Sequence, residues 1–221
     1  MDDQNDPLGS VSRSRLHFFF MADCSGSMKA DGKVEALNTA VRYTLPILVE
    51  AADNNLYTSV YLRSITFASG ARWHIGEATP IENVRWQDVT ADGYTDLGAA
   101  LDLLLVALDE LEDRSVAPGL LLVSDGQPTD DYEVPLQALL QHRWGAVSQR
   151  IAIAIGADAD FEFLRTFVGD DGVVLTADEP DRVAHQLRFA GETLLRESFG
   201  QAPRAASAVE LDQVGPVWSE D

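Results

Sequence analysis

Three short segments of the chain are rich in small side chains that carry oxygen. They are residues 23–27 (DCSGS), residues 92–96 (DGYTD) and residues 125–130 (DGQPTD). Carboxylate and hydroxyl oxygens are hard ligands, and Mg²⁺ usually takes one or two carboxylates with waters in a near-octahedral shell. In the first segment, the Asp-x-Ser-x-Ser spacing lets alternate residues point to one side of a turn, and we expect Gly26 to give that turn conformational freedom. The sequence therefore predicts a site for a divalent cation.

The elements around these segments predict an α/β fold. Apolar blocks of strand length, such as residues 15–22, 120–124 and 150–155, alternate with segments of helical period. This alternation is typical of a parallel sheet covered by helices on both faces. We expect a three-layer, Rossmann-like α/β/α sandwich whose central sheet is mostly parallel, with one antiparallel edge strand. Ligands of such sheets bind beyond the carboxyl ends of the strands, where the three segments lie.

The antiparallel edge is expected where an alternating strand at 56–69 meets Gly70 and the short run 71–75. We predict a loop over most of 76–93 and a short strand at 173–175. Apolar stripes predict the helices, and Pro46 should kink or split the first of them. The predicted helices cover residues 33–52, 97–111, 134–144, 161–167 and 180–197.

The two ends of the chain differ from the rest in composition. Residues 1–12 and 201–221 show no sustained apolar period, which favours disorder at both ends. Residues 13–200 have the composition of one packed domain. We therefore expect a single globular domain between two disordered termini.

Charge and cysteine content narrow the choice of partners and compartment. The chain has 16 Lys and Arg against 36 Asp and Glu, for a net charge of -20. Such a surface should repel nucleic acid and anionic membranes. No apolar run approaches the roughly 20 residues that span a bilayer. With Cys24 as the only cysteine and no signal-peptide pattern at the start, we expect a reducing, cytoplasmic location.

The segments MADCSGSM, DGYTDLGAAL and LLLVSDGQPTD agree in order, spacing and strand context with the metal-ion-dependent adhesion site of von Willebrand factor A domains. The chain resembles this family over about residues 13–198. The phrases FFFMADCSGSM and SDGQPTDD are most similar to the bacterial TerY-like proteins of stress and tellurium-resistance gene clusters.

This resemblance implies a ligand set and a mode of action. Asp23, Ser25 and Ser27 correspond to the first-loop ligands, Thr95 to the second-loop hydroxyl and Asp125 to the third-loop carboxylate. In the family, an acidic residue of a protein partner completes the shell of the metal, Mg²⁺ or alternatively Mn²⁺ or Ca²⁺. TerY-like proteins suggest a protein kinase or a metal-dependent protein phosphatase as candidate partners. The implied function is adaptor-like protein binding without catalysis.

Other roles for acidic residues near these loops stay open. Asp96 is either a further metal ligand or a residue favoured at a helix N-terminus, and Asp130 and Asp131 are expected to cap the helix that follows them. Without a cation, we expect Asp23 and Asp125 to repel each other. His17, His74, His142 and His185 are scattered along the chain with no pair at metal-ligand spacing.

Two enzyme classes are alternatives to a binding domain. A serine hydrolase could use Ser25, Asp158 and His185, which occur in the right order, but the segment DCSGSM is not a Gly-x-Ser-x-Gly nucleophile elbow. A Mg²⁺-dependent phosphatase or phosphotransferase could use Asp23 as its nucleophile and would need a second acid or base and a well-placed lysine. Lys29 and Lys33 lie nearby, but the Ser-x-Ser spacing serves metal coordination better. A dinucleotide site is excluded because no Gly-x-Gly-x-x-Gly motif follows a strand.

Overall fold

The computed structural model describes residues 13–199, apart from residues 114, 157, 158 and 171. The predicted disordered ends, 1–12 and 201–221, lie outside the described residues. Within the described part, the strands of one sheet are β1 (Ser14–Asp23), β2 (Thr58–Ala68), β3 (Gly70–Pro80), β4 (Gly119–Ser124), β5 (Gln149–Ile155) and β6 (Val173–Ala177). The α-helices are α1 (Lys33–Asp53), α2 (Leu97–Asp109), α3 (Glu133–Gln141), α4 (Phe161–Val168) and α5 (Pro180–Phe199). Two short 3₁₀ segments are η1 (Gly26–Gly32) and η2 (Ile81–Asn83).

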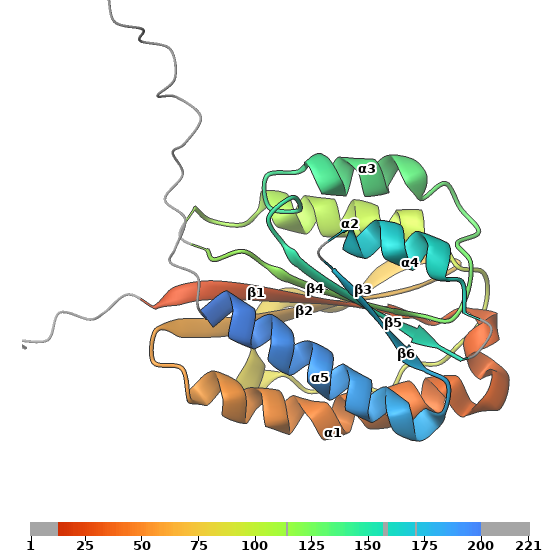
Figure 1. Ribbon diagram of the computed structural model, residues 1–221, viewed down its shortest axis with the longest axis horizontal. Helices are drawn as coiled ribbons and strands as arrows, with labels where there is room; N and C mark the ends of the chain where they lie inside the picture. Colours follow the sequence, from red (N-terminus) through yellow and green to blue (C-terminus); the bar gives the residue numbers. More distant parts are fainter. Residues whose placement is uncertain (1–12, 114, 157–158, 171, 200–221) are drawn as a thin grey trace, which may run out of the picture.

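The sheet has the order β3-β2-β1-β4-β5-β6, in which only β3 is antiparallel to its neighbour. Helices α1 and α5 lie on one face, and α2, α3 and α4 lie on the other (Figure 1). This confirms the predicted three-layer α/β/α sandwich with its antiparallel edge strand. The chain leaves β1 for β2 on one side and later returns to β4 on the other, so the strand order reverses between β1 and β4.

The central strand β1 is buried on both faces, which explains its nearly continuous apolar sequence. Phe18, Phe20 and Ala22 pack in the core under α1 and α5, whereas Phe19 and Met21 pack in the core under α2 and α4. This alternation follows from the two-residue period of a strand. The two cores hold β1 firmly and thereby fix the position of the polar segment that follows it.

Three local expectations are corrected. Helix α1 runs unbroken from Lys33 to Asp53, so Pro46 does not split it. Pro46 is exposed, which lets water satisfy the helix carbonyl that has lost its N–H partner. Strand β3 continues to Pro80, where a loop was predicted, and the third helix ends at Gln141 instead of 144.

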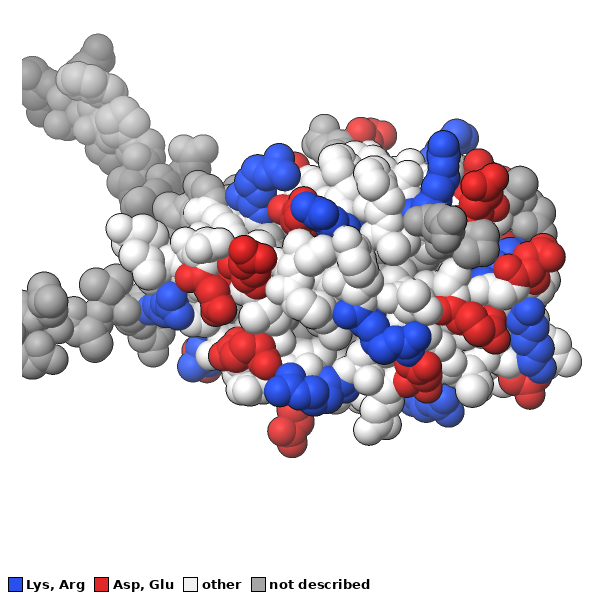
Figure 2. Space-filling model, turned by 90° about the horizontal axis from the view of Figure 1, so that it is seen from below, with Lys and Arg blue, Asp and Glu red and all other residues white. Residues whose placement is uncertain are grey.

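Acidic and basic side chains are interspersed on the face seen from below in Figure 1 (Figure 2). No large area of a single charge is visible there, in spite of the net charge of -20. None of the described helices is long and apolar enough to cross a bilayer.

Candidate metal centre

The two carboxylates of the predicted site meet at the point where the strand order reverses. Asp23 is the last residue of β1, and Asp125 directly follows β4. These strands are parallel neighbours, with Ala22 opposite Val123 in register, so their carboxyl ends deliver both side chains to one edge of the sheet. Asp23 is 0% exposed and Asp125 is 3% exposed.

Asp23 is held by hydrogen bonds to both of its carboxylate oxygens. Oδ1 accepts from the backbone N–H of Ser25 at 2.8 Å, and Oδ2 accepts from the Ser124 hydroxyl at 2.6 Å. Burial raises the pKa of Asp23, and the nearby charge of Asp125 adds to this, while the bonds from Ser124 and Ser25 act in the opposite direction. Ser124 was not predicted as part of the site, although its place directly before Asp125 is a usable signal.

A chain of hydroxyls connects the first loop to the third. Ser25 Oγ lies 2.9 Å from Ser27 Oγ, and Ser27 Oγ donates to Asp125 Oδ1 at 2.7 Å. Gly126 packs near both Ser27 and Thr95: a Cβ added to it would lie 3.5 Å from Ser27 Oγ and 3.8 Å from Thr95 Oγ1. The Thr95 hydroxyl is therefore close to this chain of serine hydroxyls. The structure therefore brings all five predicted residues to one place, around a space that a side chain at position 126 would enter.

Gly26 is needed in the first loop for a different reason from the one predicted. Its φ is not in the left-handed region, so conformational freedom is not what the position requires. Instead, its N–H donates to the Gly93 carbonyl at 2.9 Å, and a Cβ at position 26 would lie only 3.2 Å from that oxygen. Gly26 therefore allows the first and second loops to approach closely.

The second and third loops are joined by backbone and side-chain hydrogen bonds. The Thr95 N–H donates to Thr129 Oγ1 at 2.9 Å, and the Thr129 N–H donates back to the Thr95 carbonyl at 2.8 Å. The Asp96 carboxylate accepts from Thr129 Oγ1 at 3.1 Å and from the Gly70 N–H at 2.7 Å. Asp96 thus ties the second loop to the third loop and to the β2–β3 turn.

Asp130 caps a different helix from the one expected. Its two carboxylate oxygens accept from the N–H groups of Gly98 and Ala99, at 2.9 and 3.0 Å, in the first turn of α2. The prediction that Asp130 caps the following helix, α3, was wrong, because the third loop folds back over the start of α2. This arrangement satisfies two N–H groups that have no partner within the helix.

The contact between Lys33 and Asp125 is the main feature of the site that the sequence did not predict. The Lys33 ammonium donates to Asp125 Oδ2 at 2.7 Å, and both side chains are buried. The positive charge beside Asp125 offsets the repulsion expected between Asp125 and Asp23 in the absence of a cation. Lys33 and Lys29 are the two lysines of the chain; Lys29 pairs instead with exposed Asp92 at 2.8 Å, and this contact lowers the pKa of Asp92.

The donor set is a mixture of carboxylates and hydroxyls. Among the described residues, no group of three or more His, Cys, Asp or Glu side chains is placed to hold a metal ion. Two buried carboxylates, two serine hydroxyls and a threonine hydroxyl are hard oxygen donors, the kind that Mg²⁺, Mn²⁺ and Ca²⁺ take. The Lys33 ammonium shows that a cation is accommodated beside Asp125.

The geometry of Asp23 and Ser25 bears on the enzyme alternatives. Asp23 has no exposed surface, and the one hydrogen bond to each of its oxygens comes from Ser25 or Ser124, neither of which can serve as the acid or base that the enzyme would need. Ser25 Oγ contacts Ser27, and no histidine hydrogen-bonds to it among the described residues. Asp158, the acidic residue of the possible serine-hydrolase triad, lies outside the described residues.

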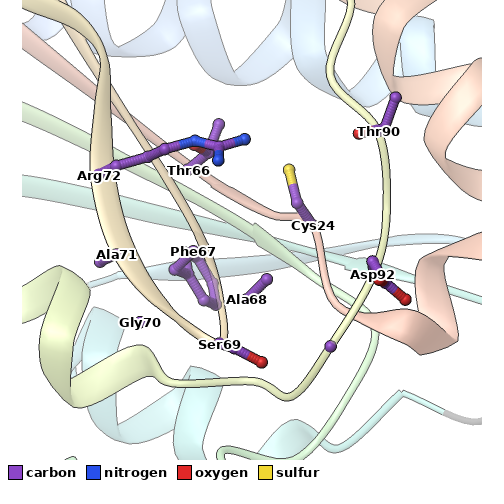
Figure 3. Close-up of a pocket in the computed structure, with 11 residues that line it drawn as sticks. Cys24, Thr66, Phe67, Ala68, Ser69, Gly70, Ala71, Arg72, Thr90 and Asp92 are labelled. Carbon is purple, nitrogen blue, oxygen red and sulfur yellow. The ribbon is translucent and has the colours of Figure 1, made fainter.

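The Cys24 side chain does not join the five oxygen donors but packs in the apolar core on the other side of the loop. The side chain is buried on the α1 face of the sheet, and its sulfur lines a neighbouring pocket (Figure 3). Burial is the main reason that its pKa is raised to about 12, with the Asp23 charge adding to the shift. The thiol is therefore protonated and a poor nucleophile.

No protein-family model matches the sequence, and the search of the curated proteins found no match. Solved structures do match. A von Willebrand factor type A protein from Catenulispora acidiphila has a TM-score of 0.63 and 17% identity, over 82% of this chain and 43% of that one. The ArnB paralog VWA2 from Sulfolobus acidocaldarius has a TM-score of 0.58 and 19% identity, over 79% of this chain and 44% of that one.

The chain has a von Willebrand factor A fold. A third match, the D319A mutant of the PilB minor pilin from Streptococcus sanguinis, has a TM-score of 0.65 and 12% identity, over 88% of this chain and 64% of that one. This chain therefore spans less than half the length of the first two proteins and under two thirds of the third. At these identities the likeness shows the fold, while the metal ligands and the resemblance to TerY-like proteins stay predictions.

Proposed function

We propose that this von Willebrand factor A domain binds a protein partner through a divalent cation, Mg²⁺ or alternatively Mn²⁺ or Ca²⁺. Asp23, Ser25, Ser27, Thr95 and Asp125 would hold the ion. The observation that carries the proposal is the convergence of these side chains where the strand order reverses. When bound, the cation would supply a position that a hard oxygen ligand completes.

The rim of the site supports a macromolecular partner. Ser27 is exposed and contacts both Ser25 and Asp125, which are buried, so the site meets the surface through this residue. Tyr94, next to Thr95, is 69% exposed. A rigid aromatic side chain beside a polar contact is typical of the residues that contribute most to protein interfaces.

The proposed partner contributes an Asp or Glu side chain to the ion. Because the chain is itself strongly acidic, one carboxylate would bind weakly alone, and affinity would come from a complementary surface around it. On the basis of the TerY-like motifs, the first candidates are a protein kinase and a metal-dependent protein phosphatase. We propose a cytoplasmic bacterial stress or signalling assembly as the setting, with no nucleic-acid or membrane partner.

A Mg²⁺-dependent phosphatase or phosphotransferase using Asp23 is the second candidate. Lys33, beside Asp125, is a buried lysine of the kind that such an enzyme would need. The complete burial of Asp23 favours the binding function instead.

The function is tested with the Thr95→Ala variant in a pull-down from a bacterial lysate, with either Mg²⁺ or EDTA present. Thr95 is chosen because its backbone makes the contacts between loops, so the variant should keep the fold. We expect wild-type protein to capture a partner in Mg²⁺ but not in EDTA, and Thr95→Ala to capture none. Thr166→Ala, which removes an exposed hydroxyl from α4, is the matched control and should behave as wild type.

Two further measurements separate the candidates. Neutralising one acidic residue of the captured protein should abolish binding, whereas capture at full strength in EDTA would place the interface elsewhere. Hydrolysis of a generic phosphoester that requires Mg²⁺ and disappears in Asp23→Asn would favour the phosphatase or phosphotransferase.

A further inference from the structure

A second polar pocket lies beside the candidate metal centre, on the other side of the first loop. Its volume is about 350 Å³, which is within the range of small-ligand sites. The last residues of β2, the first residues of β3 and the segment 90–93 form its walls (Figure 3). The side chains of Cys24, Thr66, Arg72 and Thr90 line it, so a thiol, two hydroxyls and a guanidinium border one space.

Thr66 supplies a buried donor that has no partner. Its side chain is on the wall of the pocket and is 2% exposed, and its Oγ1 makes no hydrogen bond within the described residues. A buried hydroxyl without a partner destabilises a protein, so its presence calls for a ligand or water that satisfies it. The pocket is the open space next to this hydroxyl.

Arg72 supplies a positive charge directly beside that hydroxyl. The β2–β3 register places Arg72 opposite Thr66, and the guanidinium extends across the pocket (Figure 3). Within the described part of the chain, Arg72 makes no ion pair and no hydrogen bond. Other arginines of this acidic protein do pair with carboxylates, as in Arg63–Glu110 and Arg143–Asp113.

The charges around the pocket match a ligand with one negative charge. The single guanidinium balances one negative charge on a ligand. Asp92 stands on the rim with its charge partly compensated by Lys29. A second negative charge on the ligand, as in phosphate, would meet the field of Asp92 without a second cation to balance it.

We propose that this pocket binds a carboxylate, with its oxygens accepting from the Arg72 guanidinium and from Thr66 Oγ1. A guanidinium matches the planar, two-oxygen geometry of a carboxylate better than an ammonium would. The carboxylate belongs either to a free small acid or to an acidic side chain of a protein. Binding here needs no cation and is independent of the metal centre.

The test is a titration of the ¹⁵N-labelled protein in EDTA, followed by amide chemical shifts at constant ionic strength. One arm uses acetate, and the other uses an acetylated peptide with a single glutamate, compared with the same peptide carrying glutamine. We expect saturable shifts confined to residues 66–72 and 90–93. Arg72→Gln should weaken binding about tenfold through loss of charge-assisted hydrogen bonds.

Thr66→Val distinguishes a ligand-binding hydroxyl from a structural one. Removing an unsatisfied buried hydroxyl should raise the melting temperature of the free protein and at the same time weaken carboxylate binding. Thr44→Val is the matched control, because Thr44 Oγ1 is also buried without a partner but does not line this pocket. It should raise the melting temperature and leave binding unchanged. Arg85→Gln is the control for the change in net charge that Arg72→Gln makes. Among the described residues, the Arg85 guanidinium donates only to backbone carbonyls.

The outcomes separate the two sources of the carboxylate. Saturation by acetate without binding of the peptide supports a free acid, and tighter binding of the glutamate peptide supports a protein side chain. The proposal is overturned if neither probe gives saturable shifts in this region. It is also overturned if Arg72→Gln and Thr66→Val bind both probes as the wild type does. Because EDTA is present throughout, none of these results depends on the metal centre.

Discussion

The two oxygens of Asp125 have different partners, and this difference determines the charge of the site. Oδ1 accepts from the Ser27 hydroxyl, and Oδ2 accepts from the buried Lys33 ammonium. Without a divalent cation, the Asp125 charge is thus already compensated from within the chain. A cation entering between Asp23 and Asp125 would add positive charge near Lys33, so we expect Lys33 to weaken the affinity for metal.

Lys33→Met tests this role. In EDTA, the variant leaves Asp125 buried without its charge partner, which should lower the free energy of unfolding by about 3 kcal/mol. Saturating Mg²⁺ should restore much of the loss, and the affinity for Mg²⁺ should rise. Lys29→Met, which breaks an exposed and solvent-screened pair with Asp92, should change the stability little and leave the affinity unchanged. Urea denaturation with and without Mg²⁺ measures both effects; unchanged Mg²⁺ affinity in Lys33→Met would contradict this role.

The oxygen donors were predicted from the sequence, whereas the contact between Lys33 and Asp125 was not, for a physical reason. Asp23, Ser25 and Ser27 are brought together by local spacing, and Asp125 joins them because parallel strands end at the same edge. The contact between Lys33 and Asp125 depends on the path of η1, which returns the chain over the third loop. No local pattern encodes that path.

At the level of elements, the three loops are held by contacts that cross between them. Asp130 reaches from the third loop to the first turn of α2, and Asp96 joins the second loop to the β2–β3 turn. The two bonds to Asp130 use backbone N–H groups that would otherwise lack partners at the start of α2. The position of Thr95 in the site is therefore fixed by the third loop as much as by α2.

Asp130→Ala should destabilise α2 and loosen the loops together. Loss of a capping carboxylate typically costs about 1 kcal/mol, and the like substitution Asp131→Ala should cost little. The Asp131 carboxylate is exposed and makes no hydrogen bond within the described residues, which makes it a close control. Thermal denaturation gives the comparison, and equal melting temperatures for the two variants would show that Asp130 does not cap α2.

The elements that periodicity predicted well are those whose residues are buried on a clear stripe or face, such as β1 and α2. The extension of β3 to Pro80 was missed because residues 76–80 lie half-exposed on the sheet edge and show no alternation of apolar and polar types. The pairing of β2 with β3 is also irregular between Leu62 and Ile65. Edge strands of this kind are specified by their neighbour more than by their own sequence.

For the molecule as a whole, a half-buried histidine links stability to pH. His17, on β1, stacks on Tyr61 with ring centroids 5.7 Å apart, and its Nδ1 is buried with no hydrogen bond among the described residues. Burial, with Arg15 and Arg63 nearby, lowers the pKa of His17 from 6.5 to about 4, and Glu112 opposes this weakly. The folded protein thus keeps His17 neutral in a pH range where the unfolded chain protonates it.

His17→Phe should therefore change the pH dependence of folding. Between about pH 6.5 and pH 4, the unfolded state binds one more proton at this residue, so the wild type loses up to about 1.4 kcal/mol per pH unit as the pH falls. Above about pH 6.5, His17 is neutral in both the folded and the unfolded state, so its protonation no longer lowers the stability of the wild type. Denaturation at several pH values should show a shallower loss for His17→Phe, and parallel profiles for the two proteins would contradict the low pKa.

The central claim, that the five oxygen donors form a cation site, is tested most directly by calorimetric titration of EDTA-stripped protein with Mg²⁺. We predict one saturable site in the wild type, binding weakened at least about tenfold in Thr95→Ala, and unchanged binding in Thr166→Ala. At 100 times the dissociation constant, the ion should add about 2.7 kcal/mol to the free energy of unfolding. Absence of saturable heat and of any change in melting temperature with millimolar Mg²⁺, Mn²⁺ or Ca²⁺ would contradict the claim.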